Sequence, residues 1–241
     1  MHNYCKTIGA LAAASALVAG NAQAEVEYEI HTGYSSQYIF RGLDLGDDMV
    51  ELGVDAATEF NGFGLSAGVW AAAFDSSSQT GNDTDNEIDL YVEASKDLGF
   101  LTASVGYIYY WNLASLGADN QEVYFAASRD FGFATASLTY FWDVDSTNGG
   151  DTDGYTELAL GRAFELNQCL TLNIGTNVGY LVEGGDFTAW TTKASLDWGF
   201  TETAKLSPFA AVSIGLGEST GSAWNSTENE FAAGAMLSVG F

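Results

Sequence analysis

The last eleven residues, 231–241, carry the pattern that most constrains how this chain can fold. Apolar side chains alternate with mostly smaller or more polar ones from Phe231 to Val239, and the sequence stops on Phe241. Alternation with a period of two indicates a β-strand whose two faces meet different surroundings. At the end of a soluble domain such a strand would leave an open edge, whereas in a closed barrel it pairs with the first strand. The pattern therefore predicts an outer-membrane β-barrel, with Phe241 as part of the signal read by the bacterial barrel-assembly machinery.

The first 24 residues have the features of a secretory signal peptide. Lys6 precedes an apolar run from Ile8 to Val18, and Ala22-Gln23-Ala24 provides a small-x-small cleavage pattern. The apolar run is too short to span a bilayer. We therefore expect residues 1–24 to be removed during secretion to the periplasm, which leaves residues 25–241 as a single barrel domain.

The overall composition is compatible with a barrel because alternation hides its apolar content. Hydrophobic residues make up 47% of the chain, yet the mean hydropathy is only +0.03. Strands of a membrane barrel produce this balance because lipid-facing apolar residues are interleaved with polar residues of the lumen. Proline occurs once, at Pro208, as expected where long hydrogen-bonded strands exclude it.

The chain is strongly acidic, with 32 acidic residues, 7 Lys and Arg residues and a net charge of −25 at pH 7. Nucleic acid is excluded as a partner because like charges repel. The acidity fits an outer surface that holds divalent cations among outer-membrane lipid and lipopolysaccharide, or a lumen that favours cations. The solubility of exposed loops accounts for part of it.

Polar connections of two lengths alternate along the chain and divide it into twelve candidate strands. An even number of strands places the short turns on one side and the longer loops on the other, as in bacterial outer-membrane barrels. The sequence thus predicts an all-β fold, a transmembrane antiparallel up-and-down β-barrel of about 12 strands. The short connections lie at 61–62, 97–99, 130–132, 166–169 and 199–204, and the longer, acid-rich ones at 42–48, 75–86, 112–120, 145–153, 183–186 and 218–227.

Acidic residues alternate with apolar ones in several of these strands. An ionised carboxylate that faces lipid is costly, so the acidic positions are expected to face the lumen. The bases after residue 24 other than Arg41 are expected towards the side of the short turns; they are Lys96, Arg129, Arg162, Lys193 and Lys205. The predicted pore lining comprises Glu27, Glu29, His31, Arg41, Glu51, Asp55, Glu59, Asp89, Glu93 and Lys193.

Arg41 is the one basic residue near the outer end of a predicted strand. Two interpretations remain open. It forms a constriction opposite Glu51 or Asp47, or it belongs to a buried ion pair that holds the first hairpin in place.

Two segments resemble the TorF family of porins: Tyr38-Ile39-Phe40-Arg41-Gly42-Leu43 and Gly106-Tyr107-Ile108-Tyr109-Tyr110-Trp111. The likeness extends over nearly all of residues 25–241 and matches least well from Thr201 to Gly221. It implies a porin-like barrel of the outer membrane of a Gram-negative bacterium, and it indicates architecture more firmly than substrate.

These observations predict a channel for the passive passage of ions or small solutes, with a preference for cations. A plugged barrel with a structural or receptor role is the alternative. No cofactor is expected, although Asp83, Asp85 and Glu87 place oxygen ligands at alternating positions of an outer loop, where Ca²⁺ or Mg²⁺ could bind. Solvated acidic loops are the competing interpretation.

A lipid-modifying enzyme is a third class of function. Outer-membrane enzymes of this class use a histidine beside a nucleophile, and after residue 24 the sequence has a single histidine, His31. His31 is expected in the middle of a strand on the lumen face, away from the loops and the lipid. We therefore predict no catalytic residues, and the sequence does not indicate an oligomeric state.

Overall fold

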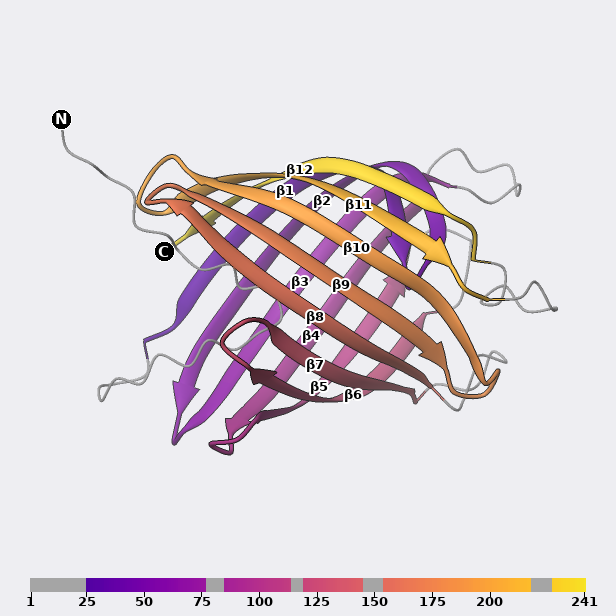
Figure 1. The fold of residues 1–241 in the computed structure, drawn as a ribbon, viewed down its shortest axis with the longest axis horizontal. Coiled ribbons are helices and arrows are strands. Elements are labelled where there is room, and N and C mark those ends of the chain that lie inside the picture. Colours follow the sequence, from indigo (N-terminus) through magenta and orange to yellow (C-terminus); the bar gives the residue numbers. More distant parts are fainter. Residues whose placement is uncertain (1–24, 77–84, 114–118, 145–153, 218–226) are drawn as a thin grey trace.

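The computed structural model describes residues 25–76, 85–113, 119–144, 154–217 and 227–241. Within these residues the chain forms twelve strands, each antiparallel to its neighbours (Figure 1). The strands are β1 (Glu27–Phe40), β2 (Leu43–Phe60), β3 (Phe63–Ser76), β4 (Asp85–Asp97), β5 (Thr102–Asn112), β6 (Asn120–Asp130), β7 (Thr135–Asp143), β8 (Tyr155–Asn167), β9 (Leu170–Leu181), β10 (Asp186–Gly199), β11 (Ala204–Gly215) and β12 (Glu230–Gly240). In the part of the chain that the structure describes, no helix is long and apolar enough to cross a membrane.

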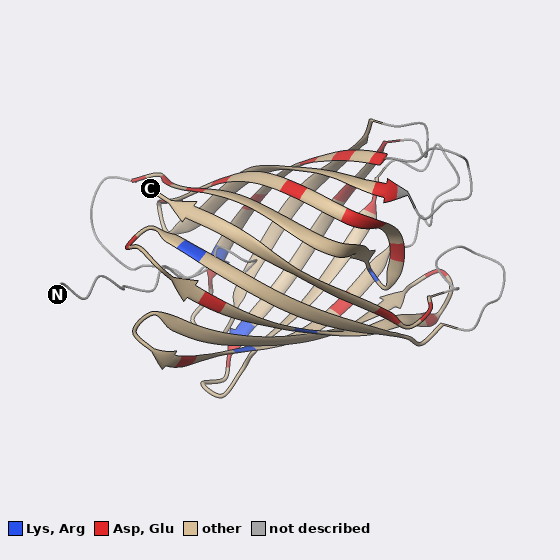
Figure 2. Ribbon diagram, turned by 90° about the horizontal axis from the view of Figure 1, so that it is seen from above, with Lys and Arg blue, Asp and Glu red and all other residues tan. Residues whose placement is uncertain are grey.

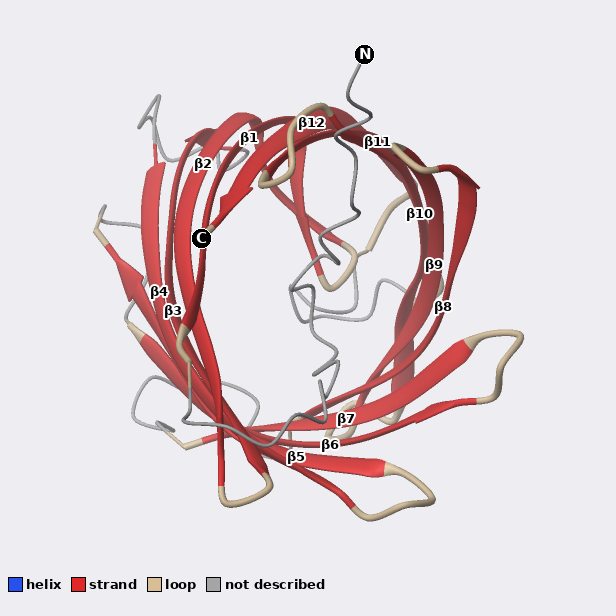
Figure 3. Ribbon diagram, turned by 90° about the vertical axis from the view of Figure 1, so that its left-hand side faces the viewer, coloured by secondary structure: helices blue, strands red, loops and turns tan. Residues whose placement is uncertain are grey.

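The sheet closes because β12 pairs with β1. Each strand otherwise pairs with the strands before and after it, and Figure 3 shows the resulting ring of strands viewed along the barrel. Tyr28 and Phe241 exchange two backbone hydrogen bonds of 3.0 Å, and their rings stack with centroids 5.9 Å apart. The predicted closed antiparallel barrel of about 12 strands is confirmed.

The two faces of the strands differ in the way that alternation requires. Val54 on β2 pairs with Ile30 on β1 and Val69 on β3, and these three outward side chains are between 40% and 44% exposed. Their neighbours along the strands point inward, and Glu29 and Glu51 are only 7% and 8% exposed. The outer surface is therefore apolar and the interior polar, the reverse of a soluble protein.

The strands are joined by short turns at the end of the barrel where the described chain begins and stops, which we call the termini end. Asn61 and Gly62 both have positive φ, 53° and 71°, as a two-residue hairpin turn requires. In two other turns the carboxylate of Asp97 or Asp130 accepts a hydrogen bond of 2.6 Å from the backbone N–H of the glycine two residues later. The opposite end, which includes the Arg41-Gly42 turn, is called the loop end.

The prediction of a long outer loop at 42–48 is wrong. β2 begins at Leu43, so that β1 and β2 form one long hairpin with Arg41 and Gly42 as its turn. The polar and apolar residues of 42–48 do not alternate regularly, because the strand pairing is irregular here. The register shifts both in the pairing of β2 with β1 and in its pairing with β3.

Glycines on the inner face allow aromatic rings to lie flat against the barrel wall. Gly68 pairs with Tyr91 across β3 and β4, and Gly106 pairs with Tyr124 across β5 and β6. A Cβ atom at position 106 would lie 2.2 Å from the Tyr124 ring, so only glycine leaves room for the ring. The Tyr124 hydroxyl then reaches Glu93 and donates a hydrogen bond of 2.9 Å.

We expect Gly106→Ala to destabilise the barrel by about 1–3 kcal/mol, because its methyl group would force the Tyr124 ring off the wall. The measurement is urea-induced unfolding in lipid vesicles, followed by tryptophan fluorescence. Gly161→Ala is the matched control, since a Cβ atom there meets nothing closer than the Ile174 carbonyl oxygen at 4.0 Å. Equal stability of the two variants would contradict the assignment.

Candidate functional site: an inward-folded hairpin in an acidic lumen

The tip of the β1–β2 hairpin leaves the barrel wall beyond Ser35. Backbone pairing of β1 with β12 ends at Ser35 and Gly234. Past this point side chains take over the pairing: Ser36 Oγ accepts a hydrogen bond of 3.0 Å from the backbone N–H of Ala233, and Gln37 Oε1 accepts one of 3.3 Å from that of Phe231. The donors of β12 thus stay satisfied although β1 has turned away from them.

The bend itself is produced by irregular pairing on both strands of the hairpin. The β1–β2 register shifts between Tyr38 and Ile39, and the β2–β3 register shifts between Asp47 and Val50. Within the second shift Asp48 has a φ of 51°, the left-handed conformation. Bulges of this kind bend a strand and increase its twist.

A small apolar cluster inside the barrel supports the bent hairpin. Met49, Ala72 and Phe74 are each between 6% and 7% exposed, and Tyr38 packs against them. The Tyr38 and Phe74 rings meet edge to face with centroids 5.1 Å apart. This cluster fills the space between the hairpin and the inner face of β3, so the tip is held down by burial of apolar surface.

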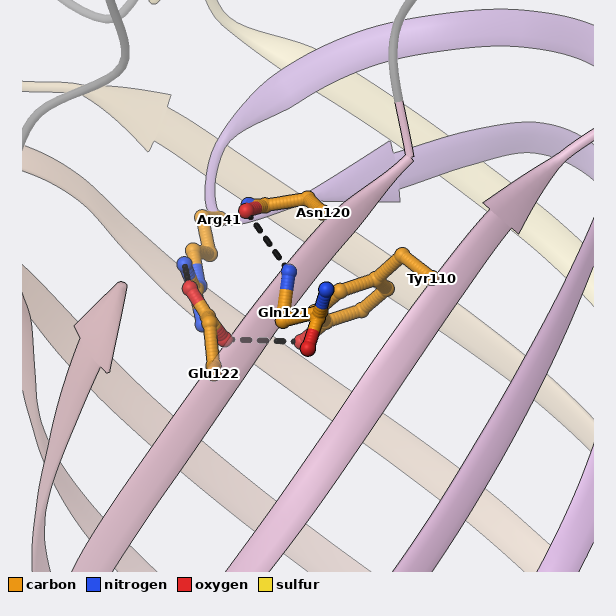
Figure 4. A network of polar contacts seen from close by, with 5 residues as sticks. All are labelled: Arg41, Tyr110, Asn120, Gln121 and Glu122. Atoms are coloured by element: carbon orange, nitrogen blue, oxygen red, sulfur yellow. Dashed lines mark hydrogen bonds and ion pairs between the residues drawn. The ribbon is translucent and has the colours of Figure 1, made fainter. Parts of the chain in front are cut away.

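At the tip, Arg41 crosses the interior and binds Glu122 on β6 (Figure 4). Both guanidinium nitrogens, Nη1 and Nη2, donate hydrogen bonds of 2.7 Å to the two carboxylate oxygens. The Glu122 carboxylate also accepts a hydrogen bond of 2.9 Å from the Tyr110 hydroxyl on β5. The side chains of Arg41 and Glu122 are 10% and 5% exposed, so the ion pair is buried.

Three aromatic rings surround the guanidinium group of Arg41. Its Cζ atom lies 4.8 Å from the centroid of Phe40, 4.5 Å from that of Phe141 and 4.4 Å from that of Tyr155. Each distance is within the range of a cation–π contact. Phe141 and Tyr155 belong to β7 and β8, which are far from β1 around the barrel. We call Tyr110, Glu122, Phe141 and Tyr155 the wall cage.

The backbone of the tip packs against another part of the wall. A Cβ atom at Gly42 would lie 2.3 Å from Cβ of Ala189 on β10, so only glycine fits there. Arg41 and Gly42 have φ of 53° and 90°. Two-residue turns of this type favour Asn-Gly, which the chain uses at Asn61-Gly62, so an arginine at the first position is strained.

Carboxylates on the inner faces of β2 and β4 form an acidic wall, and aromatic side chains bind most of them. The Trp70 Nε1 donates a hydrogen bond of 2.7 Å to Glu51. The hydroxyl of Tyr91 donates to Asp55, and that of Tyr38 donates to Glu87 at 3.4 Å. The structure places the residues of the acidic wall on one continuous inner surface; they are Glu51, Asp55, Glu87, Asp89 and Glu93.

The inner surface of β9 to β11 is mainly uncharged. Pairing places Asn173 opposite Ser195, and Asn177 opposite Thr191, which faces Ser213 in turn. Two lysines lie on this half: Lys193 has its Nζ 4.2 Å from the Phe209 ring, and Lys205 Nζ lies 4.0 Å from Glu29 Oε2. Figure 2 shows acidic and basic positions along the strands.

The predicted bases do not all lie where the sequence placed them. Lys96 is near a short turn, where its Nζ donates a hydrogen bond of 2.7 Å to the Gly62 carbonyl oxygen. Arg162 donates a hydrogen bond to the Phe133 carbonyl oxygen. Lys193 instead sits in the middle of β10, opposite Gly175 and Ala211. Its position is near the centre of the barrel wall rather than towards the short turns.

His31 lies on the inner face of β1 beside an acid. Its Nε2 is 3.3 Å from Asp55 Oδ2, and its ring covers Gly53. Glu29 is on the same face, and by alternation Glu27 is too, nearer the termini end. Glu59 is exposed at that same end of β2.

The predicted partners of Arg41 are wrong, because neither Glu51 nor Asp47 binds it. Its partner is Glu122, which is 81 residues away in the sequence. The interpretation as a buried ion pair that holds the first hairpin describes the geometry instead. Sequence reasoning missed the whole wall cage; the available signal was the odd arginine in an Asn-Gly type of turn.

The predicted metal ligands are not gathered in an outer loop. Asp83 lies outside the described residues, whereas Asp85 and Glu87 belong to β4 and are buried, at 3% and 7% exposure. Alternation in β4 turns both into the barrel rather than towards solvent. Among the described residues, no group of three or more His, Cys, Asp or Glu side chains is arranged to hold a metal ion.

A closed barrel with an apolar outside and an acidic, partly filled inside defines a class, the outer-membrane type of β-barrel. Residues 19–211 match the family described as "Bacterial protein of unknown function (Gcw_chp)". The chain belongs to this family. No curated protein sequence matches the chain.

Solved structures with the same fold include two channels. The KdgM porin has a TM-score of 0.54 at 14% identity, covering 88% of this chain and 99% of its own. The COG4313 outer membrane channel from Pseudomonas putida F1 has a TM-score of 0.55 at 10% identity, covering 92% and 97%. The outer membrane phospholipase (OMPLA) dimer of Salmonella typhi with bound calcium scores 0.50 at 16% identity, covering 89% and 90%. At these identities the likeness shows the fold alone.

Proposed function

We propose that the protein is a porin-like channel of the outer membrane of a Gram-negative bacterium, which passes ions or small solutes passively and favours cations. The observation that carries this proposal is the charge of the inner surface. Five carboxylates line β2 and β4, while the inner surface of β9 to β11 carries few charges, among them Lys193 and Lys205. Rings of carboxylates raise the local concentration of cations and exclude anions.

The experiment is a reversal-potential measurement in a planar bilayer with the purified barrel under a KCl gradient. We expect the sign of a cation-selective pore. Anion selectivity would overturn the preference, and the absence of any conductance would overturn the channel itself.

The double variant Glu51→Gln, Glu93→Gln is expected to reduce the ratio of K⁺ to Cl⁻ permeability at least twofold, because two of the five carboxylates of the acidic wall are removed. Reversal potentials measure this ratio. The matched control is Glu202→Gln, Glu228→Gln, which removes two charges at exposed positions outside the strands. An equal shift in both would show that overall charge, rather than the lumen wall, sets selectivity.

The alternative, a plugged barrel with a structural or receptor role, has a specific observation in its favour. The β1–β2 hairpin folds inward and is tied to β6 through Arg41 and Glu122. We propose that the hairpin is a constriction of the channel rather than a permanent plug, since the lumen carries acidic side chains beyond it towards the termini end, at Asp55 and Glu29. The conductance of the wild-type barrel separates these two roles: a constriction lets ions pass, whereas a permanent plug does not.

A lipid-modifying enzyme receives less support. His31 and Asp55 form a pair, but both side chains lie on the inner face, away from the outer surface that would meet lipid. Replacement of His31 by alanine leaves conductance in place if the protein is a pore, whereas an enzyme would lose turnover of phospholipid in mixed micelles.

Targeting and assembly belong to the same proposal. Residues 1–24 act as a removed signal peptide, the outer surface contacts membrane lipid and lipopolysaccharide, and Phe241 contributes to recognition by the barrel-assembly machinery. We also propose that the resemblance of the Tyr38–Leu43 segment to the TorF porins reflects a related channel; this segment forms the tip of the inward-folded hairpin.

Phe241→Ala is expected to lower the amount of folded barrel in the outer membrane several-fold, because it removes both the terminal aromatic and its stacking on Tyr28. The folded fraction is read from heat-modifiable mobility on gels of outer-membrane fractions. Phe131→Ala, an exposed aromatic in a turn at the same end, is the control. If both variants assemble alike, Phe241 has no special role.

A further inference from the structure

The surroundings of Arg41 are those of a binding site for an organic cation. A planar guanidinium group is held by a carboxylate through two parallel hydrogen bonds of 2.7 Å, and by three rings within 4.8 Å. Bidentate carboxylates and aromatic faces are the groups that recognise guanidinium and alkylammonium ligands.

The wall cage is built largely without the hairpin. Glu122, Tyr110, Phe141 and Tyr155 belong to four adjacent strands, β5 to β8. The Tyr110 hydroxyl holds the carboxylate through a hydrogen bond of 2.9 Å. The Phe141 and Tyr155 rings pack against each other with centroids 6.1 Å apart, and Tyr124 supports Phe141 at 5.6 Å. These contacts keep the cage in shape whether or not Arg41 occupies it.

The occupant comes from a turn that is itself strained. Arg41 has a φ of 53° in a turn position that favours asparagine. Ser36 and Gln37 tether the bend to β12 through side-chain rather than backbone acceptors. The hairpin therefore places its own cation in the cage at the cost of local strain.

We propose that the wall cage binds the guanidinium or primary ammonium group of a small cationic solute, and that Arg41 occupies this site in the absence of solute. The inference rests on the proposed function, because the solute reaches the cage through the lumen. Glu157 on β8 and Asp89 on β4 place two more carboxyl groups on the same region of the inner surface. The solute and Arg41 compete for one carboxylate, so solute binding releases the tip of the hairpin.

The test uses the full barrel in detergent and the probe ethylguanidinium, with ethylurea as its uncharged counterpart. Arg41→Asn empties the cage while providing the residue that the turn favours. Isothermal titration calorimetry is expected to show saturable binding of ethylguanidinium to Arg41→Asn, binding at least tenfold weaker to the wild type, and none of ethylurea. Adding Glu122→Gln is expected to weaken binding at least tenfold.

The outcomes separate this inference from the proposed function. Failure of ethylguanidinium to bind Arg41→Asn, or equal binding after Glu122→Gln, overturns the site and makes Arg41 only a structural pin. Arg41→Gly, which also accepts positive φ, replaces the asparagine variant if that variant does not fold. A conducting Arg41→Asn barrel that binds no probe leaves the channel standing without the site, whereas probe binding without any conductance leaves the site without the channel.

Discussion

Glu122→Gln is expected to destabilise the barrel by about 3–5 kcal/mol, because it leaves the guanidinium of Arg41 buried without its counter-charge. Arg41 has two hydrogen bonds to that carboxylate, and its side chain is only 10% exposed. The free energy of unfolding is measured by urea titration in lipid vesicles, with heat-modifiable mobility as an independent readout.

The matched control is Glu93→Gln, another inward carboxylate that accepts a hydrogen bond from a tyrosine but has no arginine partner. Its expected cost is about 1 kcal/mol. The double variant Arg41→Asn, Glu122→Gln should be more stable than Glu122→Gln alone, since removing both charges leaves none unpaired. If Glu122→Gln and Glu93→Gln cost the same, the ion pair does not hold the hairpin.

Loss of the Arg41–Glu122 ion pair, as in Arg41→Asn, is expected to raise single-channel conductance. Arg41 is the contact that joins the tip of the hairpin to β6, so its loss frees the tip from the far wall. A conductance unchanged in Arg41→Asn, at full folding yield, would show that the hairpin stays in place through its other contacts, such as the Met49, Ala72 and Phe74 cluster.

Val54→Arg is expected to destabilise the barrel by about 2–4 kcal/mol, the cost of a charge on the lipid face near the middle of a barrel wall. Val54 is 43% exposed and pairs with Ile30 and Val69, which are exposed on the same outer surface. Both cross-strand partners of Val54 are apolar, so neither can receive the guanidinium. Unfolding in vesicles by urea gives the free energy.

Ser66→Arg on the neighbouring strand is the control for Val54→Arg. Ser66 points inward and pairs with Glu93, so the new charge meets a carboxylate in the lumen. We expect a change within about 0.5 kcal/mol. A similar loss for both variants would show that the outer surface does not face hydrocarbon.

Local patterns in the sequence were sufficient to predict the barrel. A period of two in β1, β2 and β4 depends on successive side chains pointing to opposite faces, which is a property of each strand alone. Turn residues such as Asn61-Gly62 and Asp97-Leu98-Gly99 act within a few residues as well. Strand number and connectivity followed from these signals.

The inward hairpin was beyond the reach of such patterns. Polar residues at 42–48 led to the prediction of a solvated loop. The same residues suit either water or a polar lumen, so their polarity does not distinguish the two environments. What selects the lumen is the set of contacts with residues far along the chain, such as Glu122 and Ala189. Asp85 was misplaced for the same reason, since a run of acids at a strand end resembles a loop.

The sequence by itself determined the two-faced strands, the closed ring and the acidic interior, since each follows from the order of polar and apolar residues over short distances. Only the tertiary structure decided that Arg41 lies against Glu122, 81 residues away, and that aromatic rings of β7 and β8 enclose it. The physical reason is that a strand pattern specifies which face a side chain occupies, whereas a contact across the lumen depends on where the bend of another hairpin places its tip.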